Sequence, residues 1–134
     1  MIIERESIEL GLNTSKKQME GNWVTLSYDE GERDYSVTFH TAVCQIIKRL
    51  NFKLAFVRID PLVDDIDFVI SNEKGSILRQ NGKYNLNLNS KSTVKAIYDL
   101  CGFPKGVHRV KISDNLSKRE NYLVFRILKE EDKR

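Results

Sequence analysis

The chain has few of the residues that define specialised classes of protein. Its 134 residues include only 2 cysteines and 2 prolines, and no uncharged apolar run approaches the ~20 residues of a membrane-spanning helix. Two cysteines cannot support a disulfide scaffold, and the first residues lack the basic start and apolar stretch of a signal peptide. We therefore expect a cytoplasmic globular domain with a real core and no membrane association.

The sequence also lacks an assembled catalytic pattern. It contains no evident nucleophile with a base, no carboxylate pair in a recognisable motif, and neither a GxGxxG nor a Walker phosphate loop. The side chains that zinc would accept do not have the paired spacing of a structural site; they are His40, Cys44, Cys101 and His108. We therefore expect no enzyme activity, no cofactor and no metal.

An acidic cluster offers the one alternative for a cation. It consists of Asp64, Asp65 and Asp67, with Asp60 nearby. Carboxylates in this number can hold a divalent ion, but the spacing lacks the glycine and the terminal glutamate of a calcium loop. An acidic turn is the favoured interpretation.

Charge is divided unevenly along the chain. The total is +3, from 22 Lys and Arg against 19 Asp and Glu. Residues 1–74 hold 9 basic and 13 acidic residues, a net of −4, whereas residues 75–134 hold 13 and 6, a net of +7. The basic half suggests a polyanion partner for one face, although a random imbalance on a soluble surface explains it as well.

Hydrophobic periodicity predicts the order strand, strand, helix, strand, strand in each half. In the first half the strands are expected at 23–28, 34–39, 53–59 and 66–71, with a helix at about 40–51 capped by His40 or Thr41. In the second half they are expected at 76–80, 84–88, 107–113 and 122–128, with a helix that Asn89 or Ser90 caps and Gly102 ends.

The two halves align at an offset of 49 to 50 residues, which indicates a diverged internal duplication. One unit alone would leave a sheet face and several edges uncovered, so we expect the hairpins of both halves to interleave. The predicted fold is mostly β with two short helices (α+β), as two ββαββ halves in a closed β-barrel. The expected segments are an N-terminal segment 1–22, the halves 23–74 and 75–128 in one compact domain, and a charged tail 129–134. The segment 1–22 is left open between an added edge strand and a partner-binding or disordered arm.

Part of the second half has a familiar order of motifs. A strand at 84–88 leads into the helix, and Leu100-Cys101-Gly102-Phe103, the Lys105-x-Gly106 step and an alternating strand follow. This order resembles the swapped-hairpin family of AbrB-type transition-state regulators and MazE-type antitoxins, over about residues 23 to 128. The first half is similar to a weaker copy, with Leu50-Asn51-Phe52-Lys53 at the place of the turn.

The resemblance implies a swapped-hairpin barrel that binds double-stranded DNA. Because family members normally dimerise, one chain with both halves would be a monomeric pseudo-dimer, with a homodimer as the other arrangement. The chain departs from the family at His40 and Asn89, where a proline usually opens the helix, and around Val107-His108, where an acidic residue is usual.

The candidate nucleic-acid-binding residues are the cations of the basic half, which could neutralise phosphates or form an ordinary solvated surface. They are Arg79, Lys83, Lys91, Lys95, Lys105, Arg109, Lys111, Lys118 and Arg119. Strand alternation puts Arg109 and Lys111 on one exposed face, where they could enter a groove or simply oppose edge-to-edge aggregation. Base-edge contacts are expected from these two residues and from Lys91 or Lys95.

The predicted function is therefore that of a DNA-binding protein, a transcriptional regulator of bacterial or phage origin. The alternative is a protein-interaction module, antitoxin-like or a phage accessory protein, that pairs its exposed hairpins with a partner chain. Most aromatic residues are expected in the core, and only Tyr28 or Tyr122 is a candidate for stacking on single-stranded nucleic acid.

Overall fold

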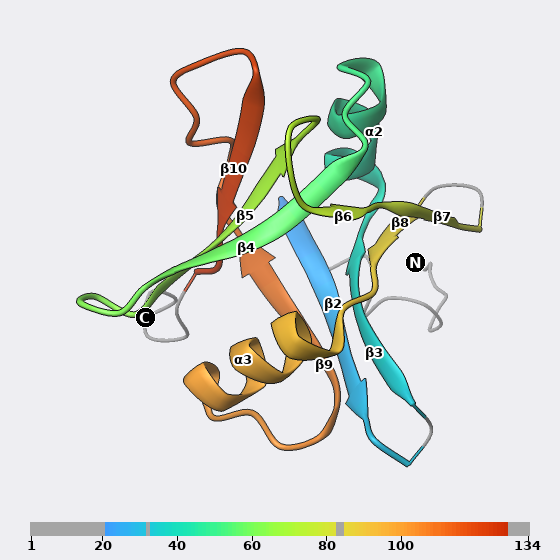
Figure 1. The fold of residues 1–134 in the computed structure, drawn as a ribbon, viewed down its shortest axis with the longest axis vertical. Coiled ribbons are helices and arrows are strands. Elements are labelled where there is room, and N and C mark those ends of the chain that lie inside the picture. The colour runs from blue at the N-terminus through green and yellow to red at the C-terminus, as the bar shows by residue number, and fades with distance from the viewer. Residues whose placement is uncertain (1–20, 32, 83–84, 129–134) are drawn as a thin grey trace, which may run out of the picture.

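The computed structural model describes residues 21–31, 33–82 and 85–128, and it contains two helices among short antiparallel strands (Figure 1). Residues 1–20 of the expected N-terminal segment 1–22 and the whole of the expected tail 129–134 lie outside the described residues. The elements in chain order are β2 (Asn22–Asp29), β3 (Asp34–Phe39), α2 (Thr41–Arg49), β4 (Leu54–Asp60), β5 (Asp65–Ser71), β6 (Ser76–Ile77), β7 (Arg79–Asn81), β8 (Asn85–Leu88), α3 (Lys91–Cys101), β9 (Gly106–Ile112) and β10 (Tyr122–Arg126). The prediction of a mostly β, α+β chain with two short helices is confirmed.

Two antiparallel sheets enclose the core. One has the strand order β10-β5-β4-β6 and the other the order β7-β8-β3-β2-β9. The apolar residues of alternating strand positions meet between the sheets, where the rings of Phe39 and Phe68 pack edge to face with centroids 5.4 Å apart. Figure 1 shows α2 and α3 at opposite ends of the molecule. Each helix contributes its buried stripe to the same core, which includes Val43 and Ile47 of α2 and Val94 and Ile97 of α3.

The expectation of a closed barrel is wrong for the part of the chain that the structure describes. The sheets approach closure at two corners: Leu78 alone separates β6 from β7, and one bridge joins Ile112 of β9 to Ile127 after β10. The second corner consists of a single bridge because the chain leaves β9 at Ser113 and enters a polar loop before β10. Without a ladder between β9 and β10, the two sheets stay separate.

Each sheet contains a hairpin of the first half flanked on both sides by strands of the second half. The β2–β3 hairpin lies between β8 and β9, and the β4–β5 hairpin lies between β10 and β6. Exchanging the halves relates these pairings to one another: β2·β9 corresponds to β4·β6, and β3·β8 and β5·β10 each pair equivalent strands. Neither half has a complete sheet of its own.

The helix ends follow the sequence unevenly. The Ser90 hydroxyl accepts a hydrogen bond from the Thr93 amide, and Gly102 ends α3 with φ of 71°, as the sequence predicts. His40 occupies the position before α2, but its side chain makes no capping hydrogen bond. The imidazole instead contacts Trp23 and Thr25 of β2.

Gly75 allows β6 to cross closely over β4. Its φ is +127°, and a Cβ there would lie 2.5 Å from the carbonyl oxygen of Ala55.

We predict that Gly75→Ala lowers the free energy of unfolding by about 3 kcal/mol, because both the backbone conformation and the close approach forbid a side chain. Urea denaturation measures this loss. Gly82→Ala is the matched control, because Gly82 has a φ of +69° and a Cβ added there would meet no neighbouring atom within 4 Å. Strain alone should cost about 1 kcal/mol there, and equal losses at the two positions would contradict the steric argument.

Candidate nucleic-acid interface

The outward side of the five-stranded sheet is mostly polar, with Trp23 and Val107 as its apolar side chains. Val24, Leu26 and Tyr28 of β2 point into the core, so the alternating residues point away from it. Pairing carries the same parity to the other four strands. We call this outward surface the polar sheet face; its residues are Trp23, Thr25, Ser27, Ser36, Thr38, Arg79, Asn81, Asn85, Asn87, Val107, Arg109 and Lys111.

One row of directly paired residues crosses all five strands of the polar sheet face. Its members in strand order are Arg79, Asn87, Thr38, Thr25 and Arg109. The Asn87 side-chain oxygen accepts hydrogen bonds from the Thr38 hydroxyl at 2.8 Å and from the Asn81 amide at 3.1 Å. An arginine thus stands at each end of a row of small hydrogen-bonding side chains.

A concave pocket of about 400 Å³ opens beside this row, where β2 begins and β3 passes into α2. Its lining combines aromatic, cationic and amide side chains. The residues are Gly21, Trp23, Thr25, His40, Thr41, Ala42, Val43, Asn85 and Arg109.

The Trp23 indole contacts two side chains of the pocket, His40 and Arg109. The His40 ring stacks on its indole with centroids 3.9 Å apart and an interplanar angle of 25°, and the Arg109 guanidinium carbon lies 5.1 Å from the indole centre. β2, which carries Trp23, lies between β3, which leads to His40, and β9, which carries Arg109. A cation near an aromatic face is attracted by the ring quadrupole, which keeps Arg109 close to the pocket.

Burial and the nearby charge of Arg109 favour the neutral form of His40. Burial lowers the pKa of the imidazole most, the hydrogen bond with the Asn85 side chain raises it, and the Arg109 charge lowers it again. The Thr25 hydroxyl lies 2.7 Å from Nε2. A neutral imidazole that makes these contacts orients the aromatic wall of the pocket and adds no charge at neutral pH.

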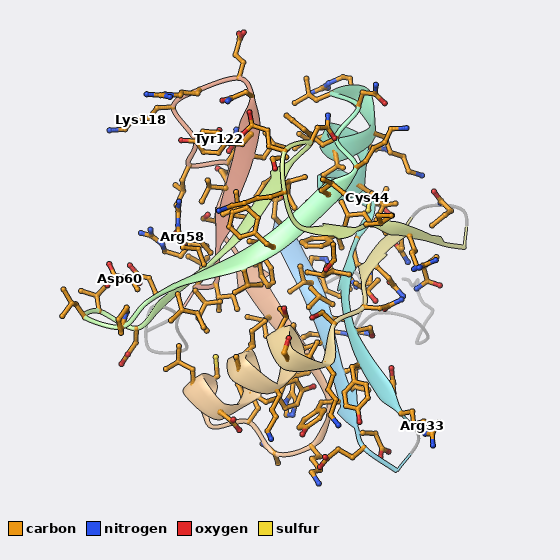
Figure 2. The ribbon with its side chains drawn as sticks, in the orientation of Figure 1. Arg33, Cys44, Arg58, Asp60, Lys118 and Tyr122 are labelled. Atoms are coloured by element: carbon orange, nitrogen blue, oxygen red, sulfur yellow. The ribbon has the colours of Figure 1, made fainter. Side chains whose placement is uncertain are left out.

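The structure divides the sequence-predicted cations into separate groups. Arg79, Arg109 and Lys111 lie on the polar sheet face. Lys118 and Arg119 belong to the loop before β10, and Figure 2 labels Lys118 on this loop. Lys83 lies outside the described residues.

A second group of predicted cations surrounds Glu30 at the turn after β2. Lys105 Nζ lies 2.9 Å from Glu30 Oε1, and this contact lowers the pKa of the Glu30 carboxyl, with smaller effects from Lys91 and Lys95. α3 carries the last two lysines and packs its buried stripe into the core. These three lysines are therefore on the side of the sheet opposite the polar sheet face.

Sequence reasoning missed three residues of the pocket: Trp23, His40 and Asn85. The alternation around Trp23 carried the signal, since its outward neighbour is Thr25 while Val24 and Leu26 point inward. Tyr28, which was expected as a stacking candidate, is buried with 6% of its surface exposed.

The acidic cluster contains an ion network in place of a cation site. Arg126 Nε lies 2.7 Å from Asp67 Oδ1, and Arg58 Nη2 lies 3.2 Å from Asp67 Oδ2. Among the described residues, no group of histidine, cysteine and carboxylate side chains is arranged to hold a metal ion.

Burial raises the pKa of the Cys44 thiol to about 11, and this thiol donates a hydrogen bond to the Phe39 carbonyl oxygen.

Comparison of the chain with family models, curated proteins and solved structures gives no match. Within the described ranges, no helix is both long enough and apolar enough to cross a membrane. Functional inference therefore depends on the geometry of the polar sheet face and its pocket.

We predict that His40 titrates below the ordinary histidine pKa of about 6.5 and that Arg109→Gln raises its pKa, because the variant removes a nearby positive charge. Folding favours the neutral ring, so its stabilising contribution is complete above pH ~6.5 and is lost as pH falls through the folded pKa. NMR titration of the imidazole resonances, assigned with a His40→Gln variant, measures both values. A His40 pKa that stays at 6.5 or above in the wild type would contradict this environment.

We predict that Asp67→Asn costs about 2 kcal/mol of unfolding free energy at pH 7. Burial by itself would raise the pKa of this carboxyl, but hydrogen bonds from Arg126 and Arg58 outweigh burial and hold the pKa below its ordinary value. The stabilisation is therefore present above the unfolded pKa of about 3.9 and disappears as pH falls through the folded pKa. Denaturation curves at several pH values test this. Asp64→Asn, at an exposed turn position, should change stability by less than about 0.5 kcal/mol.

Proposed function

We propose that the chain is a nucleic-acid-binding protein, of the DNA-binding regulator type that the resemblance implies, and that it binds through the polar sheet face. The observation that carries this proposal is the row from Arg79 to Arg109. It places guanidinium groups at both ends of a surface of hydroxyls and amides, and Lys111 adds a third cation next to Trp23. Cations can contact phosphates while hydroxyls and amides contact base edges.

The distribution of carboxylates supports the same surface. Asp29 and Asp34 share the outward parity but lie at the turn of the β2–β3 hairpin, and the Ser27 hydroxyl donates to Asp34. Four residues of strand separate Asp29 from Thr25 in the row, a distance of about 13 Å. This exceeds the screening length of about 8 Å at physiological ionic strength. At the other end of β2, Asp114 accepts a hydrogen bond from Asn22. The middle of the face can therefore attract a polyanion.

The alternative function is a protein-interaction module. One observation favours it: the turn between β4 and β5 exposes Leu62 to 91% and Val63 to 51%. Figure 1 shows this hairpin extending beyond the rest of the molecule. An apolar tip of this kind fits a protein surface better than a phosphate backbone.

We predict that the protein binds labelled DNA with an affinity that falls log-linearly with salt, because phosphate contacts release counterions. The triple variant Arg79→Gln/Arg109→Gln/Lys111→Gln should weaken binding by at least about tenfold and flatten the salt slope by up to about 3. Fluorescence anisotropy at several salt concentrations measures both quantities.

The matched control is Lys91→Gln/Lys95→Gln/Lys118→Gln, which removes the same charge from outside the polar sheet face. It should reduce affinity by less than about threefold, the loss expected from long-range electrostatics. Equal losses in the two triple variants would show a general charge effect and reject the polar sheet face as the interface. Retained binding by a protein with Leu62→Ser, together with loss of a protein partner, would assign the hairpin tip to the alternative function.

A further inference from the structure

We infer that the nucleic acid bound by the polar sheet face is single-stranded, in place of the double-stranded DNA that the resemblance implies, and that the pocket beside Trp23 receives one unpaired base. This inference rests on the proposed function and names its substrate class. Three features carry it: the width of the face, the positions of its hydrogen-bonding groups and the composition of the pocket.

The face is too broad to enter a duplex groove. Arg79 and Arg109 lie on the two outer strands of the five-stranded sheet, four interstrand steps apart. At about 4.8 Å a step this is about 19 Å. The major groove of B-DNA is about 12 Å wide and admits a helix or a two-stranded ribbon. Both arginines cannot reach the edges of the same base pairs, whereas a single strand can cross the row from one arginine to the other.

The hydrogen-bonding groups of the row are short and lie in the middle of the face. Thr25, Thr38 and Asn87 reach only a few ångströms above the sheet, while the arginines at the ends are long. Short groups at the centre can reach base edges only where a strand lies close against the sheet with its edges turned toward it, and the Watson–Crick edges are available only when the bases are unpaired. The longer cations at the ends then contact the phosphates on either side.

The pocket has the size and the lining that suit an unpaired base. Its volume of about 400 Å³ lies in the range of sites for small organic ligands. The stacked rings of Trp23 and His40 and the Arg109 guanidinium supply flat surfaces, and the Asn85 amide adds hydrogen-bonding capacity at the rim. Aromatic rings and guanidinium planes are the groups on which splayed bases stack. A base inside a duplex cannot enter, because it would have to leave its stack and its partner.

Intrinsic fluorescence can report on the pocket directly, because Trp23 is the one tryptophan of the chain. The experiment titrates the full-length protein with a mixed-sequence 20-nucleotide DNA strand, the RNA strand of the same sequence, and the DNA duplex. Fluorescence anisotropy measures affinity, and Trp23 emission measures occupation of the pocket. We expect at least one single strand to bind about tenfold or more tightly than the duplex and to quench Trp23.

The pocket variant is Ala42→Glu, which adds a carboxylate and bulk to the pocket wall at an exposed position in the first turn of α2. A glutamate there suits the helix N-terminus, so the fold should be retained. Gln45→Glu adds the same charge to an exposed position on the same helix outside the pocket lining. We expect Ala42→Glu to weaken single-strand binding by about tenfold, the loss of one stacked base, and to abolish the quenching. Gln45→Glu should change affinity by less than about twofold.

Two results would overturn the inference, and both differ from failure of the proposed function. Equal or tighter binding of the duplex, sensitive to the triple variant of the polar sheet face, rejects the single strand but retains nucleic-acid binding. Equal effects of Ala42→Glu and Gln45→Glu reject the pocket as the base site. Absence of binding to all three probes at low salt rejects the proposed function itself. A preference between the DNA and RNA strands identifies the natural sugar, and either preference supports the inference.

Discussion

The pairing of β3 with β8 and of β2 with β9 is the constraint on which the rest of the structure depends. These two ladders place the first hairpin between strands of the second half and so convert two incomplete units into one five-stranded sheet. Register follows from the same contacts, because a shift of one residue would turn Val24, Leu26 and Val37 away from the core. The register that buries these residues also aligns Arg79 with Arg109 across the outward side.

The orientation of His40 links the fold to the site. An imidazole at the start of α2 could have served the helix amides, yet here it stacks on Trp23 and contacts Thr25. The helix loses a side-chain cap, which typically contributes about 1 kcal/mol. In return the aromatic wall of the pocket has a defined position. The uncapped start of α2 therefore lies at the pocket beside the polar sheet face.

Local sequence rules predicted the elements well because each depends on residues close together in the chain. The α3 cap at Ser90, its end at Gly102 and the alternation of β8 are all of this kind. Barrel closure could not be derived in this way, because it depends on how far β9 and β10 run side by side before their loop begins. Strand parity identified Arg109 and Lys111 as facing one way, but only the strand order shows that Arg79 lies in the same row as Arg109. The Glu30–Lys105 contact was equally hidden, since 75 residues separate its partners.

Interleaving also explains how a chain with an acidic half can present a basic surface. The middle strands of the polar sheet face, β2 and β3, come from the acidic half, but their outward positions near the row are threonine, serine and tryptophan. Among the described carboxylates of that half, Asp29 and Asp34 lie at the hairpin turn, and Asp65 and Asp67 lie in the other sheet against Arg126. The basic half supplies β7 and β9 at the two sides, with their arginines. The charge difference between the halves therefore places cations on the outer strands of the polar sheet face and neutral side chains on its middle strands. The equivalent of β7 in the first half is β2, so an arginine on β7 together with a threonine at the row position of β2 requires that the two halves differ in sequence.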